Sequence, residues 1–237
     1  MNKNFMDYER PSVTADVVLL QMGEEFVSVR QSNQKMLRVL LMKRETEPCM
    51  GQFSIPGGFV GINETIEEVA RKKVFEKTGF DNFYMEQLYT FDALHRDDRW
   101  RVISTAYIGI AKPNTIPAQS GTHYCEWFNV FDEKLVGVNT GIEISFDDLA
   151  FDHGKIIKTA IERIRGKLFY TDIGFNFEND AFTVGSLRST FEAIMQKPIM
   201  NFKRTMDKHI EPTGQTVAGK AYRPAAMYKK KAIYENH

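Results

Sequence analysis

Carboxylates and ammonium groups gather in one short stretch of the chain, between residues 58 and 80. Glu64, Glu67 and Glu68 come first, and Glu76 follows among three lysines. Carboxylates three or four positions apart lie on one face of a helix, where their hard oxygens can hold Mg²⁺. An ammonium group has no lone pair for a metal, but it can bind a phosphate directly. The stretch therefore predicts phosphate chemistry, and the balance of the two charges decides between catalysis and binding.

A turn, a helix and a cap are the elements that must position these groups. Pro56, Gly57 and Gly58 predict a turn, and glycine there suits a backbone that approaches another group closely. A helix is expected at about residues 64–78, and Gly79 ends it. Its apolar positions have helical spacing; they are Ile66, Val69, Ala70 and Val74.

This frame resembles the Nudix box of the MutT-like hydrolases. Gly58, Glu64 and the closing Gly79-Phe80 stand at the spacing of that box. The family's box ends in an arginine followed by three glutamates, and the resemblance places Lys72 at the arginine position. The three glutamate positions read Lys73, Glu76 and Lys77.

The resemblance implies a metal-assisted pyrophosphatase, and the lysines argue against one. If the protein is active, Glu64 and Glu76 are its catalytic residues, and Mg²⁺ is its cofactor. Glu64, Glu68 and Glu76 are weak candidates for a metal site, and we otherwise expect no required cofactor, no catalytic residues and no metal. A solvated charged helix without any ligand role is the alternative.

A pocket that has lysines in place of carboxylates predicts direct binding of a phosphorylated effector. The expected binding groups come from the box, from its opening glycines and from neighbouring loops, although several of the cations could be ordinary surface charges. They are Lys43, Arg44, Gly57, Gly58, Lys73, Glu76, Lys77, Arg96 and Arg101. Glu126 could be a catalytic base or a charge on an edge strand, and we favour the edge-strand charge.

The pattern of the first 150 residues predicts an α/β fold. Strands are expected at residues 13–22, 36–43, 85–91, 102–111 and 126–130, around the box helix. Strands and helices in this order fit an α/β/α sandwich with a mixed sheet.

Composition excludes some classes of protein and leaves others open. No apolar run is long enough to span a bilayer, and we expect no membrane partner and a cytoplasmic protein. Residues 1–150 carry six more acidic than basic residues, and residues 151–237 carry six more basic than acidic ones. The basic part predicts contact with a polyanion, or else an internal match between two oppositely charged faces.

The last third of the chain has the order of a winged helix-turn-helix. Helices are expected at residues 153–168, from Thr183 onward and at about 199–209, followed by a hairpin within residues 210–228. The expected DNA-binding groups lie on the third helix and the hairpin; they are Asn201, Lys203, Arg204, Lys208, Lys220 and Arg223. A dimerisation appendage with a solvated basic face is the alternative.

A degenerate Nudix box followed by a winged helix resembles the Nudix-related transcriptional regulators. The resemblance implies a sensing domain at residues 1–150 for ADP-ribose or a related sugar metabolite. It implies a winged helix at residues 151–237 that binds double-stranded operator DNA, in a homodimer. The rival from another class is an active Mg²⁺-dependent hydrolase of the ADP-ribose pyrophosphatase type with an accessory C-terminal domain. The effector, the operator and the direction of regulation are not given by the sequence.

Overall fold

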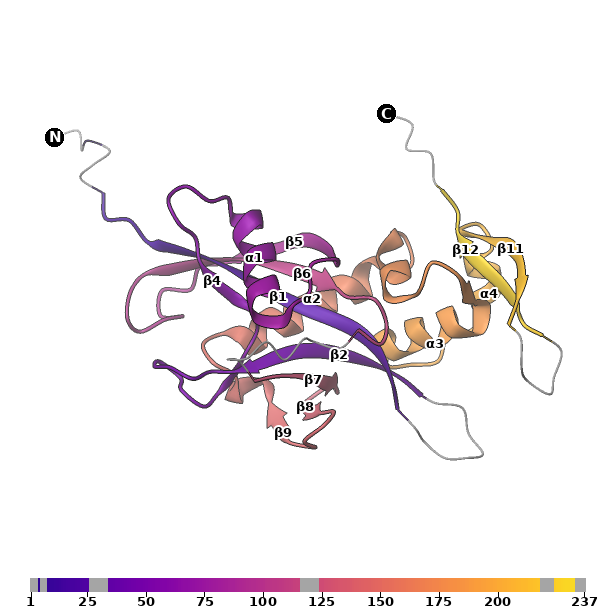
Figure 1. Cartoon of the computed structure of the whole chain (residues 1–237), viewed down its shortest axis with the longest axis horizontal. Helices are drawn as coiled ribbons and strands as arrows, with labels where there is room; N and C mark the ends of the chain where they lie inside the picture. Colours follow the sequence, from indigo (N-terminus) through magenta and orange to yellow (C-terminus); the bar gives the residue numbers. More distant parts are fainter. Residues whose placement is uncertain (1–3, 5–7, 26–33, 116–123, 218–223, 233–237) are drawn as a thin grey trace. The chain divides into compact units, whose positions relative to one another are not determined.

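The computed structural model describes residues 4, 8–25, 34–115, 124–217 and 224–232. The chain divides into two compact units. Figure 1 shows the ribbon coloured from the N-terminus (indigo) to the C-terminus (yellow). The first contains Met1–Leu20, Val39–Gly109 and Ile116–Ala160, and the second contains Gln21–Arg38, Ile110–Thr115 and Ile161–His237. The domain boundary expected at residue 150 stays a prediction. The two compact units do not show which segments of the chain fold independently.

A large sheet dominates the first half of the sequence and confirms the α/β prediction. In the described residues it has nine strands, in the order β5-β6-β1-β2-β7-β8-β9, with β3 paired to β2 and β4 paired to β1. The central strands carry apolar side chains on both faces, so that Val17, Leu20 and Leu40 have no exposed surface. The strands are β1 (Ser12–Glu25), β2 (Gln34–Lys43), β3 (Phe53–Ser54), β4 (Gly57–Phe59), β5 (Tyr84–Phe91), β6 (Val102–Ile110), β7 (Cys125–Val130), β8 (Lys134–Gly137) and β9 (Glu143–Ser145).

The long strands were predictable from composition, and the short ones were not. All five expected strands are present, with ends within a few residues of the expected positions. The strands β3, β4, β8 and β9 were missed, because two to four residues are too few to establish a period of two.

Two longer helices accompany the sheet. The helix α1 (Ile66–Thr78) packs beside β4, and α2 (His153–Lys167) carries the expected apolar face. The buried residues Ile156, Ile157 and Ala160 lie on that face. A short 3-10 turn, η2 (Phe146–Asp148), precedes α2. Among the helices in the described ranges, none is long and apolar enough to cross a membrane.

The end of the chain forms the expected winged helix. A 3-10 turn, η3 (Asp172–Phe177), leads to the strand β10 (Phe182–Thr183) and the helices α3 (Val184–Met195) and α4 (Phe202–Met206). The strands β11 (Ile210–Thr216) and β12 (Ala226–Lys230) follow, and the three strands pair in the order β10-β12-β11. The two-residue strand β10 was not anticipated; it connects the start of α3 to the hairpin.

A buried ion pair within the second unit connects the start of β2 to Glu178, the residue that follows η3. The Nζ atom of Lys35 lies 2.5 Å from an oxygen of Glu178, whose residue is only 4% exposed. The same ammonium group donates hydrogen bonds to the hydroxyls of Ser186 (2.7 Å) and Thr190 (2.8 Å). Both hydroxyls also donate to Glu178. We call these four residues the Lys35 network. If Lys35 or Glu178 were removed, the other would be left as an unpaired buried charge, which would destabilise the fold.

Candidate functional site

The strands β1 and β4 form one wall of a polar hollow in the first unit. Gly57 pairs with Asp16, and a Cβ atom added to Gly57 would lie 2.0 Å from a carboxylate oxygen of Asp16. The interpretation of Pro56-Gly57-Gly58 as a turn was wrong, because Gly57 and Gly58 belong to an extended strand. Close packing against Asp16 explains the glycine without any ligand.

Arg96 connects two carboxylates, Asp152 and Asp16, next to these strands. Arg96 donates two hydrogen bonds to Asp152, at 2.7 and 3.1 Å, and its guanidinium lies 3.8 Å from Asp16. Ser104 also donates to Asp16. The backbone N–H of Ile55 donates to Nδ1 of His153 (3.2 Å), and burial lowers the pKa of this imidazole. His153 is therefore neutral at pH 7 and serves as an acceptor.

The helix α1 is held at both ends by local hydrogen bonds. Thr65 caps its first turn, and the backbone N–H of Thr65 donates to the Glu68 carboxylate (2.8 Å). Gly79 ends the helix in the left-handed conformation, with φ of 75°. The capping pair uses Glu68, so this candidate metal ligand already has a structural task.

The box carboxylates are paired with box lysines. Lys72 lies 2.8 Å from Glu64, and Lys73 lies 2.6 Å from Glu76. These hydrogen bonds lower the pKa of Glu64 and of Glu76. Both carboxylates are ionised at neutral pH, but their near neighbours are ammonium groups.

The residues present do not fit a magnesium ion. A Mg²⁺ site needs several hard oxygen ligands around one point, and lysines stand at two of the three glutamate positions of the box. Across the part of the chain that the structure describes, no group of three or more His, Cys, Asp or Glu side chains could hold a metal ion. We therefore derive no catalytic step through a metal for Glu64 and Glu76.

Lys77 differs from the other box lysines because its side chain turns inward. Its Nζ atom donates a 2.6 Å hydrogen bond to the carbonyl oxygen of Gly57. Burial lowers the pKa of Lys77, and the nearby Asp16 carboxylate opposes this effect. The partly desolvated cation interacts more strongly with an anion than an exposed lysine would.

A pocket of about 300 Å³ brings several of the predicted groups together. The predicted effector residues that line it are Arg44, Gly57, Gly58, Lys77 and Arg96. The Arg44 guanidinium lies over the ring of Phe151, 4.9 Å from its centroid. A second hollow, of about 360 Å³, shares Arg96, Asp97, Arg99 and Phe151 with the first. Together they offer a polar site with four cations, of which Arg96 pairs with Asp152 and Arg99 with Asp97. Within the described residues, Arg44 and Lys77 have no such ion pair.

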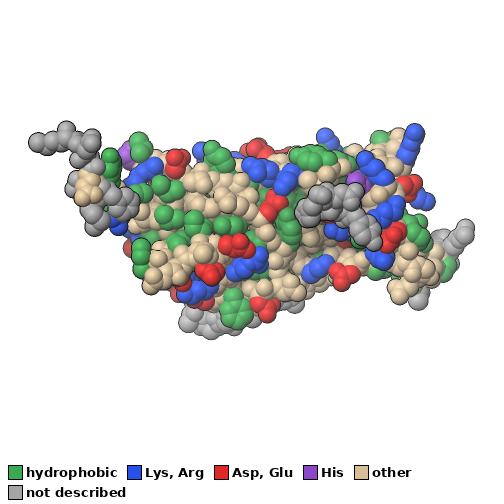
Figure 2. All heavy atoms as spheres, turned by 90° about the horizontal axis from the view of Figure 1, so that it is seen from above, with side chains coloured by type: hydrophobic (Ala, Val, Ile, Leu, Met, Phe, Trp, Pro, Cys, Tyr) green, Lys and Arg blue, Asp and Glu red, His purple; other side chains and the backbone are tan. Residues whose placement is uncertain are grey.

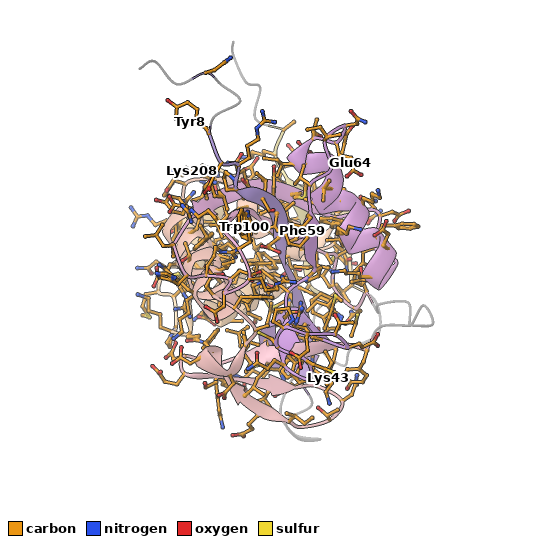
Figure 3. The ribbon with its side chains drawn as sticks, turned by 90° about the vertical axis from the view of Figure 1, so that its left-hand side faces the viewer. Tyr8, Lys43, Phe59, Glu64, Trp100 and Lys208 are labelled. Carbon is orange, nitrogen blue, oxygen red and sulfur yellow. The ribbon has the colours of Figure 1, made fainter. Side chains whose placement is uncertain are left out.

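The other predicted effector residues do not line the pocket. Lys73 and Glu76 pair with each other, and Arg101 donates to the carbonyl oxygens of Asp92 and Ala93. Lys43 is exposed at the end of β2, and Figure 3 shows it well separated from Glu64. Their roles as effector ligands stay predictions.

Several pocket residues were missed by sequence reasoning. Asp16 is a lone acidic residue in an apolar strand, which is a usable signal for a functional or packed carboxylate. Phe59 was not missed, because its aromatic ring suggests from the sequence a group that could stack on a base or sugar; it lines the pocket with half of its surface exposed (Figure 3). Phe151 lies just before α2 and His153 is its first residue. Only the tertiary fold brings these two residues into the pocket beside the box.

Glu126 is a buried structural carboxylate. The expectation of an edge-strand charge was wrong, because β7 lies between β2 and β8. Glu126 is 1% exposed and accepts hydrogen bonds from the backbone N–H groups of Asn139 (2.7 Å) and Thr140 (2.8 Å) and from the Tyr124 hydroxyl (2.6 Å). Burial disfavours the charge, but these hydrogen bonds outweigh it and lower the pKa of Glu126.

The substitution Glu126→Gln is expected to lower the free energy of unfolding at pH 7 by about 2 kcal/mol, since it removes hydrogen bonds to a charged acceptor. The pKa of Glu126 is lower in the folded state than in the unfolded state. The ionised carboxylate therefore stabilises the fold at pH values above the unfolded-state pKa, and this stabilisation is lost as the pH falls through the folded-state pKa. The difference between the parent and Glu126→Gln should therefore shrink below about pH 4.5. Urea unfolding at a series of pH values measures it. The exposed Glu133→Gln is the control, and an equal, pH-independent loss in both variants would contradict this role.

The helices α3 and α4 present the second candidate site. Thr183 caps α3 by accepting from the Ser186 N–H (3.0 Å), and Leu187, Phe191 and Ile194 are buried along its inner face. In α4, Phe202 and Met206 are anchored in the core at 3% and 1% exposure. The helix begins later than expected because Asn201, its N-cap, has a left-handed backbone; Gln196 ends α3 in the same conformation.

The exposed side of α4 is basic. Asn201, Lys203, Arg204 and Lys208 are all exposed, as predicted from the spacing. A hollow of about 640 Å³ between the start of α3 and α4 is lined by Lys203 and Arg204, and by Arg188, which was missed. Figure 2 shows lysine and arginine side chains grouped over the end that carries α4, β11 and β12. Lys220 and Arg223 lie outside the described residues.

The comparison with family models decides the assignment. The NUDIX domain model matches residues 14–140, which is more than half of the chain. The chain belongs to the Nudix family. The model of the NrtR DNA-binding winged helix domain matches residues 174–229. The Nudix domain is thus joined to a winged helix, which confirms the combination predicted from the box and the basic hairpin.

The chain is similar to named regulators over most of its length. The "ADPR responsive transcriptional repressor NtrR" of Acinetobacter baylyi is 27% identical over 231 residues, covering 94% of this chain and 83% of the relative. The structure of Shewanella oneidensis NrtR complexed with a 27mer DNA has a TM-score of 0.69 and 26% identity, covering 92% of this chain and 93% of that one. The NUDIX domain of the same NrtR, complexed with ADP ribose, has a TM-score of 0.50 and 27% identity, covering 69% and 94%.

Proposed function

We propose that the protein is a transcriptional repressor that responds to ADP-ribose or a closely related sugar metabolite. The Nudix domain binds the effector, and the winged helix binds double-stranded operator DNA. The observation that carries the proposal is the box itself, in which Lys73 and Lys77 stand at two of the three glutamate positions, in a chain that also contains a winged helix. The relatives agree with this combination: NtrR is an ADPR-responsive transcriptional repressor, and NrtR forms complexes with DNA and with ADP ribose.

The pocket has the chemistry that a nucleotide-sugar needs. Arg44, Lys77 and Arg96 supply cations, and the exposed ring of Phe59 offers a stacking surface for a base or sugar. The cations can bind the two phosphates of such a ligand. The carboxylates of Asp16 and Asp97 can accept hydrogen bonds from its ribose hydroxyls.

The winged helix supplies a matching surface for DNA. The exposed basic side chains of α4 stand on a helix that is anchored by its two buried residues, Phe202 and Met206. Such a helix can enter a major groove while the hairpin lies along the phosphates. We propose that the protein acts as a homodimer on a palindromic operator in the cytoplasm, since a two-fold dimer matches two half-sites.

The decisive experiment measures DNA binding with and without the effector. Fluorescence anisotropy with the DNA upstream of the protein's own operon is expected to show binding that weakens steeply with salt. Saturating ADP-ribose should change the apparent Kd by about fivefold or more, because an effector acts through its differential affinity for two states.

Two outcomes would contradict the proposal. Binding that does not depend on salt, or no binding at all, would remove the DNA function. Mg²⁺-dependent hydrolysis of ADP-ribose at an ordinary enzymatic rate would favour the pyrophosphatase alternative.

A further inference from the structure

We propose that the Lys77 ammonium group takes the place of a metal ion in the pocket and binds the diphosphate of the effector directly. Effector binding then needs no divalent cation and survives a chelator. This inference rests on the proposed function, namely that the pocket accepts a nucleotide-sugar with a diphosphate. It concerns the source of the positive charge, which neither the family match nor the relatives' names specify.

The position of Lys77 is the first argument. The residue stands at a glutamate position of the box, and its side chain reaches from the last turn of α1 to β4. There its Nζ atom lies 2.6 Å from the carbonyl oxygen of Gly57. A carbonyl oxygen is a hard ligand of the kind that Mg²⁺ uses, and here the ammonium group holds it.

The remaining donors of Lys77 are the second argument. An ammonium group has three N–H donors, and Gly57 accepts one of them. Within the described residues, the other two donors have no protein acceptor, and Lys77 lines the pocket, where phosphate oxygens could accept from them. Burial of the side chain in this position makes the unneutralised cation costly, and a bound anion would offset that cost.

The charges around the pocket are the third argument. Arg99 is paired with Asp97 at 2.8 Å, and Arg96 is paired with Asp152 at 2.7 Å. Of the pocket's described cations, Arg44 and Lys77 have no ion pair of this kind, although the Asp16 carboxylate lies near Lys77. Two single positive charges match the two negative charges of a diphosphate diester, whereas an added Mg²⁺ ion would be repelled by the ammonium group.

The other box lysines do not share this role. Lys72 is 52% exposed in its side chain and is paired with Glu64. Lys73 is paired with Glu76, and its methylene groups pack against Gly58. Lys77 is thus distinguished from its neighbours by direction and burial, although all three carry the same charge.

Calorimetry of the full-length protein with ADP-ribose tests the inference. We expect the same Kd in excess EDTA and in excess Mg²⁺. Lys77→Met should weaken binding on the order of 10- to 100-fold in both buffers, the range for loss of a charged hydrogen-bonding group. Lys72→Met, which makes the same charge change on the exposed side of the helix, should leave the Kd unchanged.

A charge-conserving and a charge-reversing variant complete the test. Lys77→Arg should retain binding better than Lys77→Met, and thermal unfolding of each variant reports whether the fold is intact. Lys77→Glu should abolish binding in EDTA and recover part of it in Mg²⁺, because it restores a carboxylate at this position of the box.

Each alternative result has a distinct meaning. Binding by the parent protein in Mg²⁺ but not in EDTA would overturn the inference and leave the proposed function standing. Equal Kd values for Lys77→Met and Lys72→Met would also overturn it. Absence of ADP-ribose binding in both buffers would overturn the proposed function, and this inference with it.

Discussion

Replacing Lys203 and Arg204 together by alanine is expected to weaken operator binding on the order of 100-fold. Both side chains are exposed on α4, and both line the hollow beside the start of α3. Alanine is a good helix former, and the buried anchors Phe202 and Met206 are untouched, so the fold should not change. If both side chains contact phosphates, the slope of log K against log salt should also fall by about two.

Anisotropy titrations over a range of salt concentrations measure both quantities. The matched control is Arg71→Ala with Lys134→Ala, which removes the same charge from exposed positions of the Nudix domain. ADP-ribose binding should be unchanged in both variants. An equal loss of DNA binding in the control, or a loss of ADP-ribose binding in the α4 variant, would contradict the proposal that the winged helix binds DNA and the Nudix domain binds the effector.

The second large effect is expected at the Lys35 network. Lys35→Met should lower the free energy of unfolding by about 3 to 5 kcal/mol, because it leaves the buried Glu178 carboxylate without its cation. Ser186 and Thr190 still donate to Glu178, but two hydroxyls do not neutralise a charge. Chemical denaturation followed by circular dichroism measures the loss.

The control uses a lysine that contacts the same residue from solvent. Lys112 donates to the Glu178 carbonyl (3.1 Å) and pairs with Asp180, but its side chain is 52% exposed. Lys112→Met should therefore cost about 1 kcal/mol or less. In a double-mutant cycle with Glu178→Gln, the two losses should be strongly non-additive. Equal effects at Lys35 and Lys112, or additive losses, would show that burial of the pair does not matter.

Much of the fold could be predicted because its signals are local. The cap formed by Thr183 and the end of α1 at Gly79 were visible in the sequence, since each depends on a residue type and its next few neighbours. The apolar stripe Leu187, Phe191 and Ile194 was equally local, because helical spacing identifies a buried face. The long central strands followed from their apolar, β-branched composition.

The pocket could be predicted only in part because it depends on tertiary contacts. The box identified Lys73 and Lys77 as equivalent candidates, but only β4 decides which of them turns inward. Asp16 and His153 are 137 positions apart, and no periodic signal connects them to the box. Glu126 was misjudged because the position of β7 in the sheet depends on β8, which is too short to recognise.

The Lys35 network also constrains the order in which the protein folds during its synthesis. Lys35 and Glu178 are separated by 143 positions, and Thr190 lies 155 positions after Lys35. A nascent chain therefore exposes Lys35 long before the ribosome has translated its partners. The early strands can pair while synthesis continues, but this part of the second unit closes only after Thr190 has left the ribosomal tunnel. A truncated polypeptide that stops before residue 178 would keep the whole Nudix box and leave the Lys35 ammonium group without its carboxylate.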